Sequence, residues 1–513
     1  MKKYFSFLPL LLAFSVFLYA QDKSLPRSNP EAEGVTAKGI IDFLDAAAKS
    51  KNEMHSFMFL RHGKVIAEGW WDPYKPGLKH TMYSLSKSFT STGVGLAVSE
   101  GKLKLTDKVI SFFPEYVPAQ QSEYLKNLTV KDLLTMSVGQ APDPTPFIVQ
   151  HDSNWIKLFL ALPIQHQPGT VFLYNTMATF MLSAIVQKVA GQKLIDYLKP
   201  RLFDPLNIQG MDEEEDASGI NTGGWGLRIK TEDMAKFGQL YLQKGNWQGK
   251  QLLPSKWVQE ATTVKIMQSP EITGSKRDSS DWLQGYCYQF WRCRHNAYRG
   301  DGAFGQYIIV LPDQDAVIAI TSETADMQNE LNLVWDYLLP SISSSTLLRN
   351  TAADDLLKQR LAALALPFKT STVAPSGAML ADQQFSFDSN AKHIRGIGLH
   401  FENDRCNLTL KTDAATYTIG FSSAGQLTGE TEMPGPSLVS GSKSSIKRLA
   451  PYKIAGHYYW KDDHTLELKL RYIESPHTLS ITCQLDGDKM TASFNNSFEG
   501  NKTTVITGKR ATW

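Results

Sequence analysis

Residues 84–101 read SLSKSFTSTGVGLAVSEG, and this stretch predicts a helix that runs to Ser99 and stops at Gly101. The residues along it are small or apolar, as is typical of a helix packed inside a protein. A charged Lys87 is costly in such a setting unless it has a partner or a chemical role. The stretch therefore predicts a central helix and marks a candidate site at its start.

Strand patterns lie on both sides of this helix in the sequence, and further helical patterns lie between them. The apolar strand patterns cover 57–60, 65–67, 306–311 and 316–321, and the helical patterns cover 177–189 and 231–242. Within the first pair, Arg61-His62-Gly63-Lys64 predicts a hairpin turn. Strands at both ends with helices between them predict an α+β fold, in which helices flank an antiparallel sheet.

The C-terminal part of the chain has a different pattern. Apolar and polar residues alternate in 397–401, 466–472 and 479–485, with turn residues between these runs and no convincing helix. This pattern predicts a second, all-β domain that is either a barrel or a sandwich. The predicted organisation is a signal peptide at 1–20, a first domain at 21–345, a helical linker at 346–365 and the all-β domain at 366–513.

The first twenty residues have the layout of a secretory signal peptide. Lys2 and Lys3 precede an apolar run from Tyr4 to Leu18, and cleavage is expected after Ala20. The run is shorter than the roughly 20 residues that a membrane span needs. We therefore expect a periplasmic or secreted protein without a stable membrane span.

Composition excludes several classes of protein. Apolar residues make up 42% of the 513-residue chain, which indicates a globular protein, and 53 Lys+Arg nearly balance 51 Asp+Glu. Nucleic-acid binding is therefore not expected. The chain has no H-E-x-x-H or C-x-x-C motif, so neither a metal nor another cofactor is expected.

Cysteines and histidines give weaker signals. Cys406 and Cys483 share strand parity with apolar neighbours and are predicted to face a core, whereas Cys287 and Cys293 lie in one short stretch. The sequence leaves open whether any of the four forms a disulfide. The histidines at 62, 80, 151 and 166 are predicted to be surface or loop residues.

Ser84 and Lys87 are three residues apart, so their side chains share one face of the predicted helix. A serine hydroxyl is a poor nucleophile without a base beside it, and a desolvated lysine with a lowered pKa can be that base. The same S-x-x-K spacing also begins at Ser99, Ser389, Ser440 and Ser444. Those four lie at a helix end or in polar, loop-like stretches, so we favour Ser84.

Two further segments contain candidate functional residues. Tyr174 lies on a predicted loop before the helix at 177–189, and it is either a general acid or base or an ordinary half-buried loop residue. Residues 300–305 read GDGAFG and match G-x-G-x-x-G, but they lead into a strand instead of a helix. This order excludes a dinucleotide fingerprint and leaves a glycine-rich strand entrance, where a ligand can approach the backbone.

Together, Ser84-x-x-Lys87, Tyr174 and Gly302 resemble the serine β-lactamase and penicillin-binding protein superfamily. The resemblance is strongest to the branch of class C β-lactamases, related esterases and 6-aminohexanoate-oligomer hydrolases. It covers residues of about 30 to 345 and is supported by three further blocks, LTVKDLLTMSVG at 128–139, GGWGL at 223–227 and TEDM at 231–234.

The resemblance implies a fold and a set of roles. The fold would be that of the β-lactamases and transpeptidases, with Ser84 acylated by the substrate and Lys87 and Tyr174 transferring its proton. The oxyanion hole would consist of the backbone N–H groups of Ser84 and of Ala303, which follows Gly302. By the same resemblance, Asn175 and Gly300 are candidate substrate-binding residues.

The chain departs from the superfamily pattern in two places. Thr176 occupies the position of the Asn in the superfamily's Tyr-x-Asn motif, and Gly300 occupies the position of the Lys in Lys-Thr-Gly. The cation that would hold the carboxylate of a β-lactam or peptide is therefore missing, with Arg299 as a candidate substitute.

These residues predict an exported serine hydrolase that cleaves a small ester or amide through an acyl-enzyme at Ser84. One alternative is a β-lactamase or D-Ala-D-Ala carboxypeptidase with the same mechanism, acting on a β-lactam or peptide. Another is a non-catalytic sensor or binding protein related to penicillin-binding proteins. The sequence leaves the oligomeric state and the role of the all-β domain open.

Overall fold

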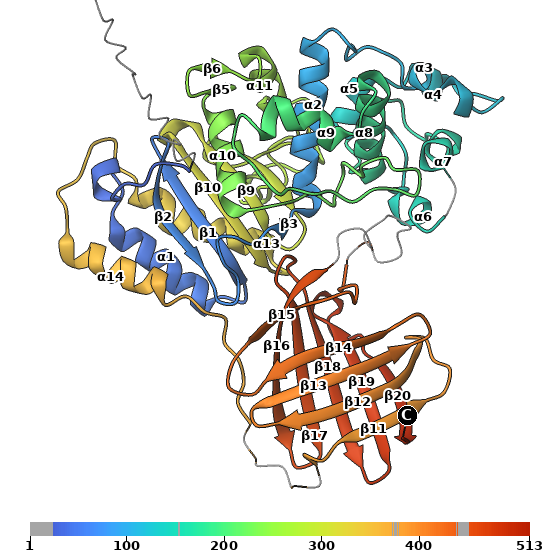
Figure 1. Cartoon of the computed structure of the whole chain (residues 1–513). Helices are drawn as coiled ribbons and strands as arrows, with labels where there is room; N and C mark the ends of the chain where they lie inside the picture. The colour runs from blue at the N-terminus through green and yellow to red at the C-terminus, as the bar shows by residue number, and fades with distance from the viewer. Residues whose placement is uncertain are drawn as a thin grey trace, which may run out of the picture.

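The computed structural model describes residues 24–151, 154–371, 379–437 and 451–512, with the single residues 373, 377 and 439. The predicted signal peptide and the S-x-x-K matches at Ser440 and Ser444 lie outside these residues. A sheet with helices on both faces forms one part of the molecule, and a cylinder of strands forms the other (Figure 1).

The first part is built on a six-stranded antiparallel sheet with the order β2-β1-β10-β9-β8-β7. Its strands are β1 (Glu53–Arg61), β2 (Lys64–Trp70), β7 (Trp291–Arg292), β8 (Tyr298–Gly302), β9 (Gln306–Leu311) and β10 (Ala316–Glu323). The two predicted strand pairs are confirmed, and β1 pairs with β10, so that Phe57 lies opposite Ile320. Segments about 260 residues apart in the sequence therefore meet at the centre of the sheet.

Helices cover both faces of this sheet, because successive strand residues point in opposite directions. On β1, Met58 and Leu60 enter one hydrophobic core with α2, α8 and α10, whereas Phe57 and Phe59 enter a second core with α1, α13 and α14. The helices are α1 (Ala37–Lys49), α2 (Ser86–Ser99), α3 (Val109–Phe112), α4 (Glu123–Asn127), α5 (Val130–Leu134), α6 (Thr145–Ile148), α7 (Trp155–Ala161), α8 (Thr176–Ala190), α9 (Leu194–Leu198), α10 (Thr231–Leu242), α11 (Ser255–Thr262), α12 (Ser275–Asp278), α13 (Met327–Leu333) and α14 (Thr351–Ala362). Within the described residues, no helix is both long and apolar enough to cross a membrane.

The central helix predicted from the sequence is α2, and nearly all of its residues are buried. A Cβ atom at Gly95 would lie 2.2 Å from the Trp257 ring, so the helix can approach α11 only with glycine there. The predicted start is corrected: α2 begins at Ser86, and Ser84 lies in the preceding 3₁₀ turn η2 (Tyr83–Leu85). Tyr83 has a φ of 45°, in the left-handed region, so regular helix cannot begin before it.

The second part is a closed barrel, which decides between the two predicted all-β forms. Its strands are β11 (Gln383–Phe387), β12 (Ile394–Glu402), β13 (Arg405–Thr412), β14 (Thr416–Ser422), β15 (Leu427–Thr431), β16 (Tyr452–Asp462), β17 (Thr465–Tyr472), β18 (Thr478–Asp486), β19 (Lys489–Asn496) and β20 (Thr504–Arg510). Ser422 of β14 pairs with His457 of β16 and closes the sheet, while β15 also pairs with β16. Cys406 and Cys483 lie in the barrel core as predicted, and all four cysteines are free.

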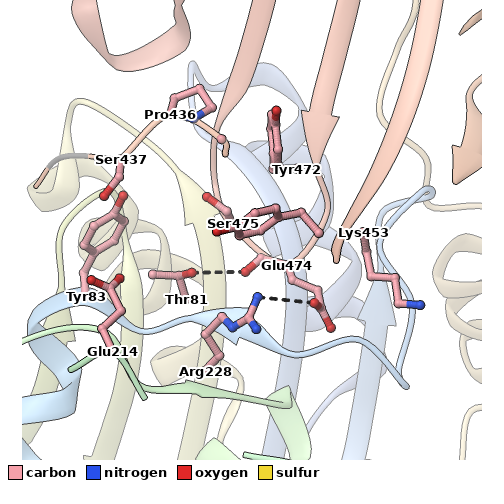
Figure 2. A pocket seen from close by; sticks show the side chains of 12 residues that line it. Thr81, Tyr83, Glu214, Arg228, Pro436, Ser437, Lys453, Tyr472, Glu474 and Ser475 are labelled. Carbon is pink, nitrogen blue, oxygen red and sulfur yellow. Dashed lines mark hydrogen bonds and ion pairs between the residues drawn. The ribbon is translucent and has the colours of Figure 1, made fainter. Parts of the chain in front are cut away.

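The barrel docks against the first part through the turn between β17 and β18. Both the backbone N–H and the hydroxyl of Thr81 donate to the Glu474 carbonyl, at 2.9 and 3.1 Å, and Arg228 forms an ion pair with the Glu474 carboxylate (Figure 2). Arg471 makes a two-pronged ion pair with Glu53 at the start of β1. The docked turn therefore lies next to β3 (His80–Thr81), directly before η2.

Candidate active site

The turn η2 and the start of α2 bring Ser84 and Lys87 into contact. Lys87 Nζ donates to Ser84 Oγ at 3.1 Å and to the Gly224 carbonyl at 2.7 Å. The Lys87 side chain is only 2% exposed. Burial lowers the pKa of Lys87 to about 7, although the nearby carboxyl groups of Asp143 and Asp301 act in the opposite direction. A large fraction of this amine is therefore neutral at neutral pH.

Tyr174 lies beside the lysine, just before α8. Lys87 Nζ is 5.1 Å from the centre of the Tyr174 ring, and that ring stacks on Trp291 with centroids 5.8 Å apart. Burial raises the pKa of the Tyr174 hydroxyl above its ordinary value, while a hydrogen bond with Ser84 opposes part of this rise. The structure thus brings the three predicted residues together and adds Trp291, which no sequence motif indicated.

The glycines of 300–305 allow β8 to lie against the start of α2. A Cβ atom at Gly302 would lie 2.0 Å from the Met82 carbonyl oxygen, and one at Gly300 would lie 2.8 Å from Ser88 Oγ. As predicted, the segment leads directly into a strand, β9, and its first three residues are also the end of β8. Among the described residues, no backbone carbonyl accepts a hydrogen bond from the N–H of Ala303 in this segment.

Arg299, the candidate substitute cation, is buried within the fold. Its Nε donates to Asp301 Oδ2 at 2.8 Å, its Nη1 donates to the Asp281 carbonyl at 2.8 Å, and its side chain is fully buried. The guanidinium lies 4.5 Å from the Trp282 ring centre. Burial raises the pKa of Asp301 even though the Arg299 charge opposes the shift. Arg299 is therefore buried and bonded to Asp301 and to the Asp281 carbonyl within the fold.

Asn175 lies beside Tyr174, but its amide is used within the fold. The side-chain oxygen accepts from the Ala178 N–H at 3.1 Å and caps α8, and the side-chain nitrogen donates to Gln140 Oε1 at 3.0 Å. The residue is 1% exposed. Asn175 therefore positions the start of α8 next to Tyr174.

Two of the other S-x-x-K matches lie in the described residues, and both differ from Ser84. Ser99 ends α2 and donates to the Leu96 carbonyl at 2.8 Å, and Ser389 contacts Arg395 near the start of β12. The prediction for His80 is wrong: it lies in β3, which pairs with β4 (Arg228–Ile229), and it is 4% exposed because its ring packs beside His55 and Tyr74. The described residues contain no group of three or more His, Cys, Asp or Glu side chains that could hold a metal ion.

The antiparallel sheet with helices on both faces, and the contact of Ser84 in η2 with Lys87 in α2 beside β8, form the arrangement that the resemblance to the serine β-lactamase superfamily predicts. The profile of the Beta-lactamase family matches residues 48–338, more than half of the chain. The protein therefore belongs to the Beta-lactamase family, and it is a serine hydrolase.

Relatives within the family differ in their named activities. The chain is 25% identical over 293 residues to the 6-aminohexanoate-dimer hydrolase of Paenarthrobacter ureafaciens, covering 53% of this chain and 73% of that protein. It is 26% identical over 214 residues to a β-lactamase of Escherichia coli K12, covering 36% of this chain and only 56% of that relative. The crystal structure titled "putative beta-lactamase" from Bacteroides dorei aligns with a TM-score of 0.50 at 14% identity, over 60% of this chain and 99% of its own. That structural likeness shows the fold alone.

Proposed function

We propose that the protein hydrolyses a small ester or amide through an acyl-enzyme on Ser84. The observation that carries the proposal is the hydrogen bond between Lys87 Nζ and Ser84 Oγ, made by a buried amine whose pKa is lowered to about 7. A neutral amine in this position can accept the proton that the serine must lose.

The proposed reaction has two halves. Ser84 Oγ attacks the substrate carbonyl carbon while its proton passes to Lys87, and the carbonyl oxygen gains negative charge. The N–H groups of Ser84 and Ala303 stabilise that oxygen, at roughly 2.7–4 kcal/mol for each donor. When the bond to the leaving group breaks, Tyr174 donates its proton to that group and regains one from Lys87. Water then attacks the acyl carbon with the same proton transfers reversed, and Ser84 is regenerated.

The proposed substrates have no carboxylate beside the scissile bond. Gly300 stands where the Lys-Thr-Gly motif has its lysine, a larger side chain there would contact Ser88, and the Arg299 guanidinium donates to Asp301. These features favour a neutral ester or amide over a β-lactam or a peptide C-terminus. The match to a relative named 6-aminohexanoate-dimer hydrolase supports an amide as one option, because an amide bond joins two aminohexanoate units.

The test compares p-nitrophenyl acetate, an acyl p-nitroanilide and a chromogenic cephalosporin on wild type, Ser84→Ala and Ser99→Ala. We expect ester or anilide hydrolysis that Ser84→Ala abolishes and Ser99→Ala retains, and a single fluorophosphonate adduct at Ser84 by peptide mass spectrometry. An adduct elsewhere would refute the mechanism. Preferred cephalosporin turnover would indicate a β-lactamase, and labelling without turnover of any substrate would indicate a sensor.

We also propose that residues 1–20 direct export and are removed after Ala20. The basic start and the apolar run to Leu18 support this proposal. N-terminal sequencing of the protein recovered from a cell's periplasm should begin at Gln21. Recovery of the uncleaved chain from the cytoplasm would contradict it.

A further inference from the structure

Four aromatic side chains meet where the barrel touches the candidate site. Tyr83 and Phe304 come from the first part of the molecule, and His477 and Phe498 come from the barrel; we call this group the aromatic clamp. The Phe304 ring meets His477 edge-on at 4.8 Å and Tyr83 at 5.7 Å between ring centres. Phe498 lies 4.4 Å from His477 and 5.7 Å from Phe304.

Hydrogen bonds fix His477 at the centre of the clamp. The ring is fully buried; its Nδ1 lies 2.7 Å from Glu323 Oε1, and its Nε2 lies 2.5 Å from the Tyr83 hydroxyl. Because a carboxylate accepts hydrogen bonds, Nδ1 donates to Glu323, and Nε2 shares a hydrogen bond with the Tyr83 hydroxyl. Ser497 Oγ donates to the same Glu323 oxygen at 2.6 Å. Glu323 at the end of β10 therefore holds the barrel histidine in one orientation.

The two members of the aromatic clamp that come from the first part of the molecule are sequence neighbours of the proposed oxyanion donors. Tyr83 directly precedes Ser84, and Phe304 directly follows Ala303. Both have φ in the left-handed region, 45° and 68°, which non-glycine residues adopt only when their surroundings hold them there. On the other side, the Phe304 carbonyl accepts from Ser322 Oγ at 2.8 Å and from the Thr324 N–H at 3.1 Å.

We infer that the barrel completes the oxyanion hole, with His477 as the positioning residue that fixes the backbone on either side of the two N–H donors. The inference rests on the proposed function, because it gives the barrel a role in the acylation of Ser84. The first part of the molecule supplies the donors, and the clamp supplies the restraint that keeps Tyr83 and Phe304 in their strained conformations.

This role has a distinct kinetic signature. An oxyanion donor acts on charge that develops in the transition state, so its displacement lowers kcat and leaves substrate binding largely unchanged. A misplacement of about 1 Å can cost about 100-fold in rate. A barrel wall that merely contacted substrate would instead change KM.

The experiment uses the full-length protein, with p-nitrophenyl acetate as substrate and a fluorophosphonate as acylating probe. His477→Gln keeps an acceptor near the Nε2 position, whereas His477→Asn keeps a donor near the Nδ1 position and loses the Tyr83 contact. We expect His477→Asn and His477→Ala to lower kcat and the labelling rate by about 10–100-fold with KM nearly unchanged. His477→Gln should recover most of this loss, and Phe498→Leu should lie between.

Tyr74→Phe is the matched control, because it removes an interdomain hydrogen bond to the Ser475 carbonyl without touching the clamp. It should lower the thermal midpoint slightly and leave kcat unchanged. The inference is overturned if His477→Asn and Phe498→Leu behave like Tyr74→Phe, or if they raise KM alone. If His477→Ala fails to fold, the Gln and Asn variants and Phe498→Leu decide. Ser84→Ala distinguishes failure of the proposed function from failure of this inference. Activity that survives in Ser84→Ala refutes the proposed function. If Ser84→Ala is inactive but His477→Asn is fully active, only the inference about the aromatic clamp is refuted.

Discussion

At the scale of single residues, the chemistry depends on a lysine held where its charge is disfavoured. Lys87 is covered by α2 itself, by Tyr174 and by the segment around Gly224, and its amine donates to a hydroxyl and a carbonyl. Desolvation therefore outweighs the attraction of Asp143 and Asp301 and keeps the amine available as a base.

Replacement of this lysine should separate catalysis from folding. Lys87→Met keeps the volume of the side chain but removes the base, so the acylation rate should fall by about 10²–10⁴-fold. The thermal midpoint should not fall, because a buried amine with a lowered pKa does not favour the folded state at neutral pH. The measurements are fluorophosphonate labelling rate and calorimetry, with Lys102→Met of the Ser99 tetrad as control. Near-normal labelling in Lys87→Met, or a loss shared with Lys102→Met, would contradict the assignment.

The same lysine predicts the pH dependence of the rate. Only the neutral amine accepts a proton, and its fraction grows as pH rises through the pKa of about 7. We therefore expect kcat/KM for p-nitrophenyl acetate to rise about tenfold per unit below pH 7 and to level off above it. A profile that is flat from pH 5 to 8 would exclude Lys87 as the base.

At the scale of elements, the site depends on how closely β8 approaches η2. Gly302→Ala places a Cβ atom against the Met82 carbonyl, which is backbone and cannot move aside without shifting the turn that carries Ser84. Such overpacking typically costs about 1–3 kcal/mol. We expect a lower thermal midpoint and at least about tenfold slower acylation as the oxyanion donors separate.

Gly77→Ala is the control for this prediction, because a Cβ atom there meets nothing within 4 Å. It should leave both the thermal midpoint and the acylation rate near those of wild type. If Gly302→Ala matches Gly77→Ala in both measurements, close contact between β8 and η2 is not required.

Elements with a strong local period could be predicted from the sequence, and contacts between distant segments could not. Alternating and helical patterns predicted β1, β2, β9, β10, α2, α8 and α10. The Ser84–Lys87 spacing predicted that the two side chains meet, although Ser84 lies in η2 and not in α2. His80 was misassigned because a two-residue strand leaves no periodic signal. The limits of the predicted domains at 345 and 366 remain predictions.

The same distinction between local patterns and distant contacts applies to the candidate site. Ser84, Lys87 and Tyr174 could be found by motif, but the Trp291 contact with Tyr174 and the closure of the barrel between β14 and β16 depend on tertiary packing. His477 approaches Tyr83 from 394 residues along the chain, and nothing in its local sequence indicates that contact.

At the scale of the whole molecule, one hydrophobic core of the first part extends to two residues of the barrel. Ala455 of β16 and Ile473 of the docking turn are buried with the core that contains Phe57 and Phe59 of β1. Around this apolar contact lie charged and aromatic groups from both parts, including the ion pair of Arg471 with Glu53. Docking therefore depends on burial and on the ionisation of the groups beside it.

Two buried histidines behind this interface predict how the molecule responds to acid. His55 and His80 are 0% and 4% exposed, and His55 Nδ1 lies 3.2 Å from His80 Nε2. Burial lowers the pKa of both from 6.5; Glu53 acts against this shift at His55, and the charge of His55 further lowers the pKa of His80. Arg471 also opposes protonation of His55, whereas Glu323 favours it, and His477 opposes protonation of His80. Both rings are therefore neutral in the folded protein at neutral pH.

The sign of the effect follows from proton binding. Below pH 6.5 the unfolded chain protonates these histidines while the folded protein does not, so the free energy of unfolding should fall as pH decreases. The slope approaches about 1.4 kcal/mol per pH unit for each histidine. Thermal midpoints measured from pH 8 to 5 should thus decline below about 6.5, and His55→Gln should reduce that decline. His400→Gln, an exposed histidine on β12, should leave it unchanged. A midpoint that is constant down to pH 5, or an equal effect of both variants, would show that the buried pair does not limit stability in acid.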